Sequence, residues 1–198
     1  DTKKYYRGRI YNLNSRQKYE EYKDQIFEEY YDYQKDDLNF NAFTIKLQKW
    51  YCKNSDREEV LQRTIDEIGD KVIVFCRFLE SIPKGAHKIT GEENLKERRN
   101  IIKEFKDGKF QVLYLTYGCG AYGLNLQFCK NIIFAEQVWD YALQVQAEAR
   151  IYRLGQAKEV AYYTLYCGGV GLEDLMQKCI SRKSTLLDTI KSEIAKTK

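Results

Sequence analysis

The sequence predicts an α/β protein in which a parallel sheet is flanked by helices and preceded by a helical segment. From residue 71 onward, short continuous apolar runs such as Val72–Cys76 are typical of strands buried on both faces. These runs alternate with amphipathic stretches, which is the pattern of right-handed βαβ units. Before residue 71, apolar residues recur at helical spacings instead. We therefore expect a helical lead-in at 1–70 and an α/β domain at 71–198.

The lead-in is polar and rich in tyrosine. Ser15 is suited to cap a first helix, and a second helix is expected over roughly 41–50. The run Ser55-Asp56-Arg57-Glu58 resembles a capping box for a third helix that ends at Gly69. The first helix carries an apolar stripe at spacings of three and four, interpreted as a packing face: Tyr19, Tyr22, Ile26, Tyr30 and Tyr33.

The α/β domain should contain several strands and helices in alternation. The strands are expected at 72–76, 86–90, 110–116, 131–135 and 160–167, and the helices at 92–106, 141–153 and 172–194. Because the carboxyl ends of parallel strands meet at one rim, the working loops of the domain should lie there. These loops follow Cys76, Thr90, Thr116 and Ala135.

Composition narrows the class of protein without selecting one function. The 198 residues suit one substantial domain, and a formal charge of +4 permits a nucleic-acid partner without requiring one. No run approaches the ~20 apolar residues of a membrane span, so no membrane partner is expected. Since the chain starts at Asp1 and not at a methionine, we expect it to be part of a longer protein.

The cysteines favour reduced, buried thiols. The chain has six cysteines and one histidine, and no two cysteines form a Cys-x-x-Cys pair. Zinc ligation therefore lacks its usual spacing, and no metal site is expected in this chain. Buried reduced thiols are typical of a cytoplasmic protein.

The segment at 146–156 carries a cluster of planar donors. Gln146, Arg150 and Arg153 are separated by four and three residues, so on a helix all three project from one face. Such donors suit phosphate oxygens. A solvated helix, with Arg150 paired to Glu148 or Glu159, is an alternative that the spacing leaves open.

The pattern Gln-Ala-x-x-Arg-x-x-Arg-x-Gly-Gln at 146–156 resembles motif VI of the Swi/Snf-type branch of superfamily-two helicases. The resemblance implies that Arg150 and Arg153 are arginine fingers that reach the γ-phosphate of ATP across a cleft. It also implies that Gln146 helps to couple two lobes. Tyr152 is a departure, because the family usually has histidine there.

A second block, at 115–126, is similar to motif V of the same family, a strand that ends in serine or threonine followed by a glycine-rich loop. Ala121 replaces the second glycine of the family pattern, and a plain tight turn is the alternative reading of the loop. The resemblance implies that this block contacts nucleic acid through Thr116, Gly118 and Gly120, and that it contacts the nucleotide through Gly123 and Asn125.

Two shorter stretches resemble motif IV and the segment that follows it. Val72 to Phe78 ends at a strand exit that faces nucleic acid in the family, which implies such a contact for Arg77. Thr90 and Gly91 resemble a phosphate-contacting turn. Downstream, 131–139 and 160–174 are similar to the last strands of the family and to the acidic start of its closing helix, which here includes Glu173. The resemblance covers roughly residues 71–195.

The chain contains neither a Gly-x-x-x-x-Gly-Lys-Ser/Thr loop nor an Asp-Glu-x-His motif, which the family places on its first lobe. The resemblance therefore implies the second RecA-like lobe of an ATP-dependent DNA translocase or helicase, inactive alone. ATP and Mg²⁺ would be held mainly by the N-terminal RecA-like lobe of the same protein, and the DNA is expected to be duplex. Two alternatives stay open: a degenerate, non-catalytic RecA-like module that binds nucleic acid or a protein, and an RNA helicase lobe. The compact motif spacing favours a phage or bacterial source.

Overall fold

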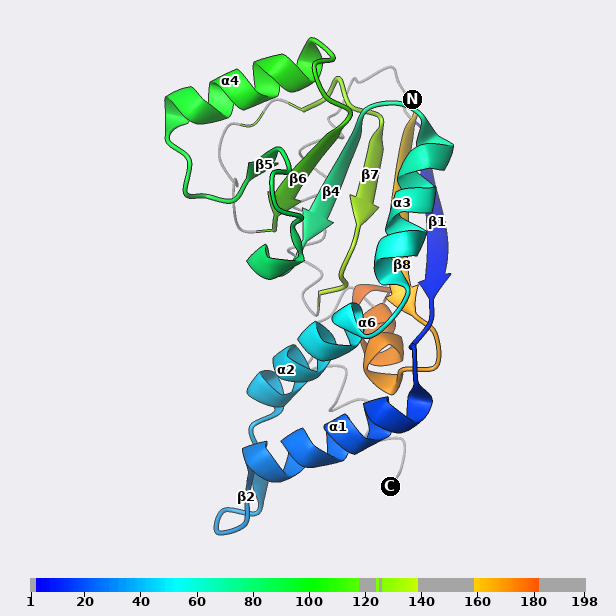
Figure 1. Cartoon of the computed structure of the whole chain (residues 1–198), viewed down its shortest axis with the longest axis vertical. Helices are drawn as coiled ribbons and strands as arrows, with labels where there is room; N and C mark the ends of the chain where they lie inside the picture. Colours follow the sequence, from blue (N-terminus) through cyan, green and yellow to red (C-terminus); the bar gives the residue numbers. More distant parts are fainter. Residues whose placement is uncertain (1–2, 118–123, 125, 139–158, 182–198) are drawn as a thin grey trace.

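The computed structural model describes residues 3–117, 124, 126–138 and 159–181. Its centre is a six-stranded sheet in the order β1-β8-β7-β4-β6-β5, in which every pair of neighbours is parallel (Figure 1). The strands are β1 Lys4–Tyr11, β4 Val72–Cys76, β5 Lys88–Ile89, β6 Val112–Thr116, β7 Asn131–Phe134 and β8 Val160–Cys167. The predicted fold class, a parallel sheet flanked by helices, is confirmed.

Helices cover the sheet and extend beyond its carboxyl end. They are α1 Arg16–Tyr30, α2 Phe40–Lys53, α3 Arg57–Ile68, α4 Leu95–Lys106 and α6 Gly171–Ser181, with a short 3-10 turn η1 at Leu79–Ser81. Two short antiparallel strands, β2 Tyr31–Asp32 and β3 Asp37–Leu38, join α1 to α2. In Figure 1, α1, α2 and α6 gather beyond the arrowheads of the strands, whereas α4 lies on the side of β5 and β6.

The first strand corrects the expectation that the lead-in is helical throughout. β1 lies at an edge of the sheet and pairs with β8 from Lys4↔Val160 to Tyr11↔Cys167. Most of its side chains are exposed, so it shows none of the apolar continuity that marks the inner strands. Its pairing with a strand so distant in the chain is a non-local contact that local periodicity does not report. The division of the chain at residue 70 stays a prediction.

The observed helix ends confirm some of the predicted caps and correct others. Ser15 caps α1 by accepting a hydrogen bond from the Lys18 amide, as predicted. Gly69 ends α3 with a left-handed φ of 62°, also as predicted. The capping box expected at Ser55 does not form, because the N-cap of α3 is Asp56 and not Ser55. The Asp56 carboxylate does not cap the helix either and accepts from the Asn12 amide instead (2.6 Å). α1 ends at Tyr30 and not at Tyr33, since the chain turns there into β2.

The core consists of two apolar clusters, one on each face of the sheet. Alternate residues of β4 supply them: Val72, Val74 and Cys76 face the cluster under the lead-in helices, whereas Ile73 and Phe75 face the cluster under α4. The apolar stripe of α1 packs against the core, and the ring of Tyr22 stacks on that of Trp50 in α2 with centroids 4.8 Å apart. Tyr33, expected in the stripe, lies beyond α1 and is 68% exposed. Among the described residues, no helix is long and apolar enough to cross a membrane.

The packing of α4 allows a direct test of the second cluster. Phe105 is fully buried and its ring stacks on Phe110, with centroids 5.4 Å apart. We expect Phe105→Ala to lower the free energy of unfolding by about 3–5 kcal/mol, measured by urea denaturation. Leu95 lies on the same helix and is 62% exposed, so Leu95→Ala should change stability by no more than about 0.5 kcal/mol. Equal effects of the two substitutions would show that α4 does not pack in this way.

Candidate functional site

The parallel register brings three of the predicted nucleic-acid residues, all within the described ranges, to one rim of the sheet. Cys76 pairs with Thr116, and Ile89 pairs with Leu115, so the exits of β4, β5 and β6 are level with one another. Arg77, Thr90 and Thr116 therefore share the carboxyl rim. The Thr116 hydroxyl donates to the carbonyl oxygen of Thr90 (3.3 Å), which ties the exits of β5 and β6 together.

The turn after β5 is a set of convergent donors. The amides of Thr90 and Gly91 donate to Glu93 Oε2 at 2.8 and 3.1 Å, and the Thr90 hydroxyl donates to Glu93 Oε1 at 3.2 Å. Gly91 has a φ of 99°, a conformation that favours glycine. Partial burial acts to raise the pKa of Glu93, but these hydrogen bonds outweigh it and hold the pKa below its usual value. The turn can thus hold an anionic oxygen, which here belongs to the protein itself.

Arg77 is held from behind by a buried side chain. It is half-buried, and its Nη1 donates to Gln48 Oε1 of α2 at 2.5 Å. Its guanidinium carbon lies 5.3 Å from the centre of the Phe78 ring. Burial lowers the pKa of Arg77 from its usual range. The structure therefore places this predicted contact at the rim in a fixed orientation, bound to the lead-in.

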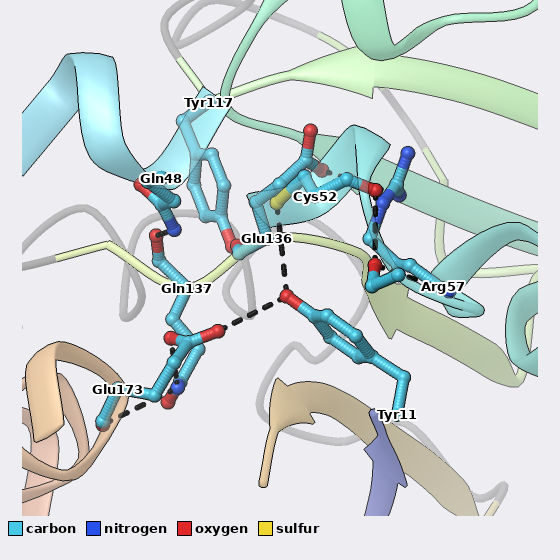
Figure 2. A network of polar contacts seen from close by, with 9 residues as sticks. Tyr11, Gln48, Cys52, Arg57, Tyr117, Glu136, Gln137 and Glu173 are labelled. Atoms are coloured by element: carbon cyan, nitrogen blue, oxygen red, sulfur yellow. Dashed lines mark hydrogen bonds and ion pairs between the residues drawn. The ribbon is translucent and has the colours of Figure 1, made fainter. Parts of the chain in front are cut away.

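A buried polar network, which we call the exit network, lies behind this rim (Figure 2). Gln48 is fully buried and its Nε2 donates to the Gln137 carbonyl oxygen at 3.0 Å. The Tyr117 hydroxyl donates to the Glu136 carbonyl oxygen at 3.2 Å. Both carbonyl groups just beyond β7 are thus held by side chains from other parts of the chain.

The network continues to α6 and β1. The Gln137 Nε2 donates to Glu173 Oε2 (2.6 Å), and Glu173 Oε1 accepts from the Tyr11 hydroxyl (3.1 Å) and the Cys167 amide (3.2 Å). Burial raises the pKa of Glu173 to about 7, against the opposing effect of these donors. The acidic start of the closing helix is therefore a buried acceptor rather than a solvated charge.

A buried ion pair completes the network on the side of α3. Arg57 Nη1 lies 3.8 Å from Glu136 Oε2, and the two side chains are 4% and 0% exposed. Burial raises the pKa of Glu136, although the nearby Arg57 charge acts in the opposite sense. Sequence reasoning missed Gln48, Arg57, Glu136 and Gln137, because polar residues in an apparently solvated helix or after a strand carry no burial signal.

The remaining predicted site residues lie outside the described part of the chain. They are Gln146, Arg150 and Arg153 of the predicted finger segment, and Gly118, Gly120, Gly123 and Asn125 of the glycine-rich loop. Within the described ranges, no group of three or more His, Cys, Asp or Glu residues could hold a metal ion.

The buried carboxylate of Glu173 makes a prediction about pH. A glutamate in the unfolded chain titrates near pH 4.3, whereas Glu173 in the folded chain titrates near 7. The folded state therefore binds the proton more tightly, so this group lowers the free energy of unfolding as pH rises from about 4.5 to 7. The effect is at most roughly 3–4 kcal/mol.

Glu173→Gln should remove this part of the pH dependence in urea denaturation between pH 5 and 8. Two of its three donors can still bind the amide oxygen. Asp174→Asn, at the exposed neighbouring position, is the control and should retain the wild-type slope. If the Glu173→Gln chain keeps that slope as well, the carboxylate does not titrate as the structure indicates.

Comparison with known proteins places this geometry in a family. The helicase conserved C-terminal domain family matches residues 52–155. The chain is 30% identical over 119 residues to a probable global transactivator of Orgyia pseudotsugata multicapsid polyhedrosis virus, covering 54% of this chain and 24% of that protein. It is 28% identical over 144 residues to the ATP-dependent helicase ULS1 of Saccharomyces cerevisiae, covering 66% of this chain and 9% of that protein. The chain thus spans about a quarter or less of these relatives, and their sources do not support the expected phage or bacterial origin.

Solved structures share the fold. The C-terminal part of the Fun30 ATPase domain matches with a TM-score of 0.66 at 16% identity, covering 93% of this chain and 89% of that one. The Swi2/Snf2 ATPase core of Sulfolobus solfataricus in complex with dsDNA matches with a TM-score of 0.64 at 21% identity, covering 91% of this chain and 44% of that one. With the parallel sheet and the family match in agreement, this chain belongs to the helicase conserved C-terminal domain family, and it shares the fold of these Swi2/Snf2-type ATPase structures.

Proposed function

We propose that this chain is the second motor lobe of an ATP-dependent translocase or helicase that acts on duplex DNA. In this proposal it supplies arginine fingers and part of the DNA groove, and it hydrolyses no ATP alone. The observation that carries the proposal is the shared rim. The register places Arg77, Thr90 and Thr116 level with the exit of β7, from which the chain runs toward the predicted finger segment.

Contact with DNA would be made through phosphates. The turn at Thr90 and Gly91 already holds the Glu93 carboxylate with two amides and a hydroxyl, and Arg77 adds a positive charge on the same rim. Phosphate contacts position a protein on DNA without reading sequence, and they weaken as salt rises. The relative from Sulfolobus solfataricus, solved with dsDNA, supports duplex DNA as the substrate.

ATP would be shared between two lobes. The N-terminal RecA-like lobe of the same protein would hold the phosphates and Mg²⁺, because this chain has no phosphate-cradling motif. When bound, ATP supplies the phosphoryl group that is transferred to water. Arg150 and Arg153 would then neutralise the charge that develops on this group, an effect worth roughly 10³–10⁵ in rate in other NTPases. Gln146 would help to couple the lobes, and Gly123 and Asn125 would contact the nucleotide. The buried free thiols among the described residues support a cytoplasmic location for the motor.

The finger assignment predicts a crossed pattern in the two-lobe protein. Arg153→Ala should lower the kcat of ATP hydrolysis by roughly 10³-fold or more while DNA affinity changes little, since the interaction is made chiefly in the transition state. Arg153→Lys should rescue poorly, because it keeps the charge and loses the planar fork. Arg77→Gln should instead weaken DNA binding and reduce its salt dependence while basal hydrolysis persists.

Lys71 provides a matched control, because it precedes β4 and so lies at the opposite end of the strand from Arg77. Lys71→Gln removes the same charge and should leave DNA binding within twofold of wild type, roughly the scale of a remote surface charge. Near-normal stimulated turnover in Arg153→Ala would overturn the finger assignment. Turnover by the isolated chain that depends on Arg153 would overturn the two-lobe arrangement.

A further inference from the structure

We propose that Gln48 is a positioning residue that couples the DNA-facing exit of β4 to the exit of β7. The inference rests on the proposed function and assigns a role to a residue of the lead-in. One buried amide makes both contacts: Gln48 Oε1 accepts from Arg77 Nη1 (2.5 Å), and Gln48 Nε2 donates to the Gln137 carbonyl oxygen (3.0 Å).

The two partners require an amide at this position. A guanidinium can only donate hydrogen bonds and a carbonyl oxygen can only accept them. A carboxylate would satisfy Arg77 and repel the Gln137 carbonyl, whereas an ammonium group would do the reverse. Gln48 is the side chain of matching length that satisfies both, and its orientation is therefore fixed by its surroundings.

Stability alone does not account for this arrangement. Burying polar groups costs desolvation free energy that their hydrogen bonds only partly return, so an apolar side chain facing apolar neighbours would stabilise the fold as well or better. Gln48 lies on a helix whose other buried residues include the apolar Phe43 and Leu47, whereas the hydroxyl of the buried Thr44 donates within the same helix to the Asn41 carbonyl oxygen (3.0 Å). A polar connector here is explained by the need to join two particular groups.

Gln137, which Gln48 contacts from α2, and the neighbouring Glu136 also have hydrogen-bond partners at the exit of β6 and in α6. The Tyr117 hydroxyl holds the adjacent Glu136 carbonyl, and the Gln137 side chain binds Glu173. Residues 136–137 therefore follow displacements at the exits of both β4 and β6, two of the three strands that end in predicted DNA contacts. Beyond Val138 the sequence continues toward Gln146 and the predicted fingers.

This geometry gives Gln48 a defined energetic role. When a DNA phosphate binds Arg77, any shift of the guanidinium is passed through Gln48 to the backbone at 137. The connection should raise turnover only when DNA is bound, so it should affect the DNA-stimulated kcat and leave hydrolysis without DNA largely unchanged. Coupling between sites in proteins is typically worth about five- to 150-fold.

The test uses the two-lobe protein with ATP and a blunt duplex DNA. Gln48→Met keeps the volume of the side chain and removes both hydrogen bonds. Gln48→Glu keeps the contact with Arg77 and loses the donor to Gln137. Thr64→Val is the burial-matched control, because Thr64 is 2% exposed and its hydroxyl donates only to the Val60 carbonyl within α3 (2.7 Å). Thermal midpoint, DNA affinity, basal turnover and turnover at saturating DNA are measured for each.

We expect both Gln48 variants to lose roughly tenfold of the DNA-stimulated kcat, within the usual range of coupling. Basal turnover and the DNA affinity of Gln48→Glu should stay near wild type, and Thr64→Val should retain full stimulation. Three results would overturn the coupling: full stimulation in both variants, full stimulation in Gln48→Glu alone, or a proportional loss of basal and stimulated turnover. A wild-type protein that duplex DNA does not stimulate would overturn the proposed function itself.

Discussion

The architecture of this lobe depends on one constraint: the polar groups buried beyond the carboxyl ends of the strands must find partners. Glu136 and Glu173 are both fully buried there, and no strand of the sheet can satisfy their side chains by itself. Glu173 accepts hydrogen bonds from Gln137 and from the Cys167 amide of β8, and the lead-in supplies a further partner to each of the two carboxylates. Arg57 faces Glu136, and the Tyr11 hydroxyl donates to Glu173. Removal of Arg57 would leave the buried Glu136 without its opposite charge, which is strongly destabilising. Loss of the Tyr11 hydroxyl would cost less, because Glu173 would keep the Gln137 and Cys167 donors.

The constraint explains why the lead-in and the sheet form one structure. β1 supplies Tyr11, α2 supplies Gln48 and α3 supplies Arg57, so each contributes a polar side chain to the exit network. The same network reaches Arg77 at the rim. The residues proposed to touch DNA are therefore connected to the segment that leads toward the predicted fingers, through hydrogen bonds rather than through apolar packing alone. Such a connection transmits orientation, since each hydrogen bond has a preferred direction.

The inner strands could be predicted from sequence because their apolar residues are a local signal: β4 is buried throughout, and β8 alternates between buried and half-buried residues. β4 and β8 occupy the predicted ranges, and the rim order follows from their parallel pairing. β1 could not be predicted, because its side chains are mostly exposed and its partner lies at the far end of the chain. The burial of Gln48 and Arg57 could not be predicted for a related reason. Helical periodicity assigns polar residues to the solvent-exposed face, whereas tertiary contacts bury these two. The roles of Arg150 and Arg153 stay predictions from the motif.

The proposal that this chain belongs to a DNA motor is tested most directly by finding which nucleic acid stimulates ATP hydrolysis. ATP hydrolysis by the two-lobe protein would be measured with duplex DNA, single-stranded DNA and RNA of equal length, over a range of salt concentrations. We expect duplex DNA to stimulate turnover most, with a half-saturating concentration that rises steeply with salt, because the proposed contacts of the rim are with phosphates. Stimulation by RNA equal to or greater than that by duplex DNA would contradict the assignment, as would a half-saturating concentration that salt does not change.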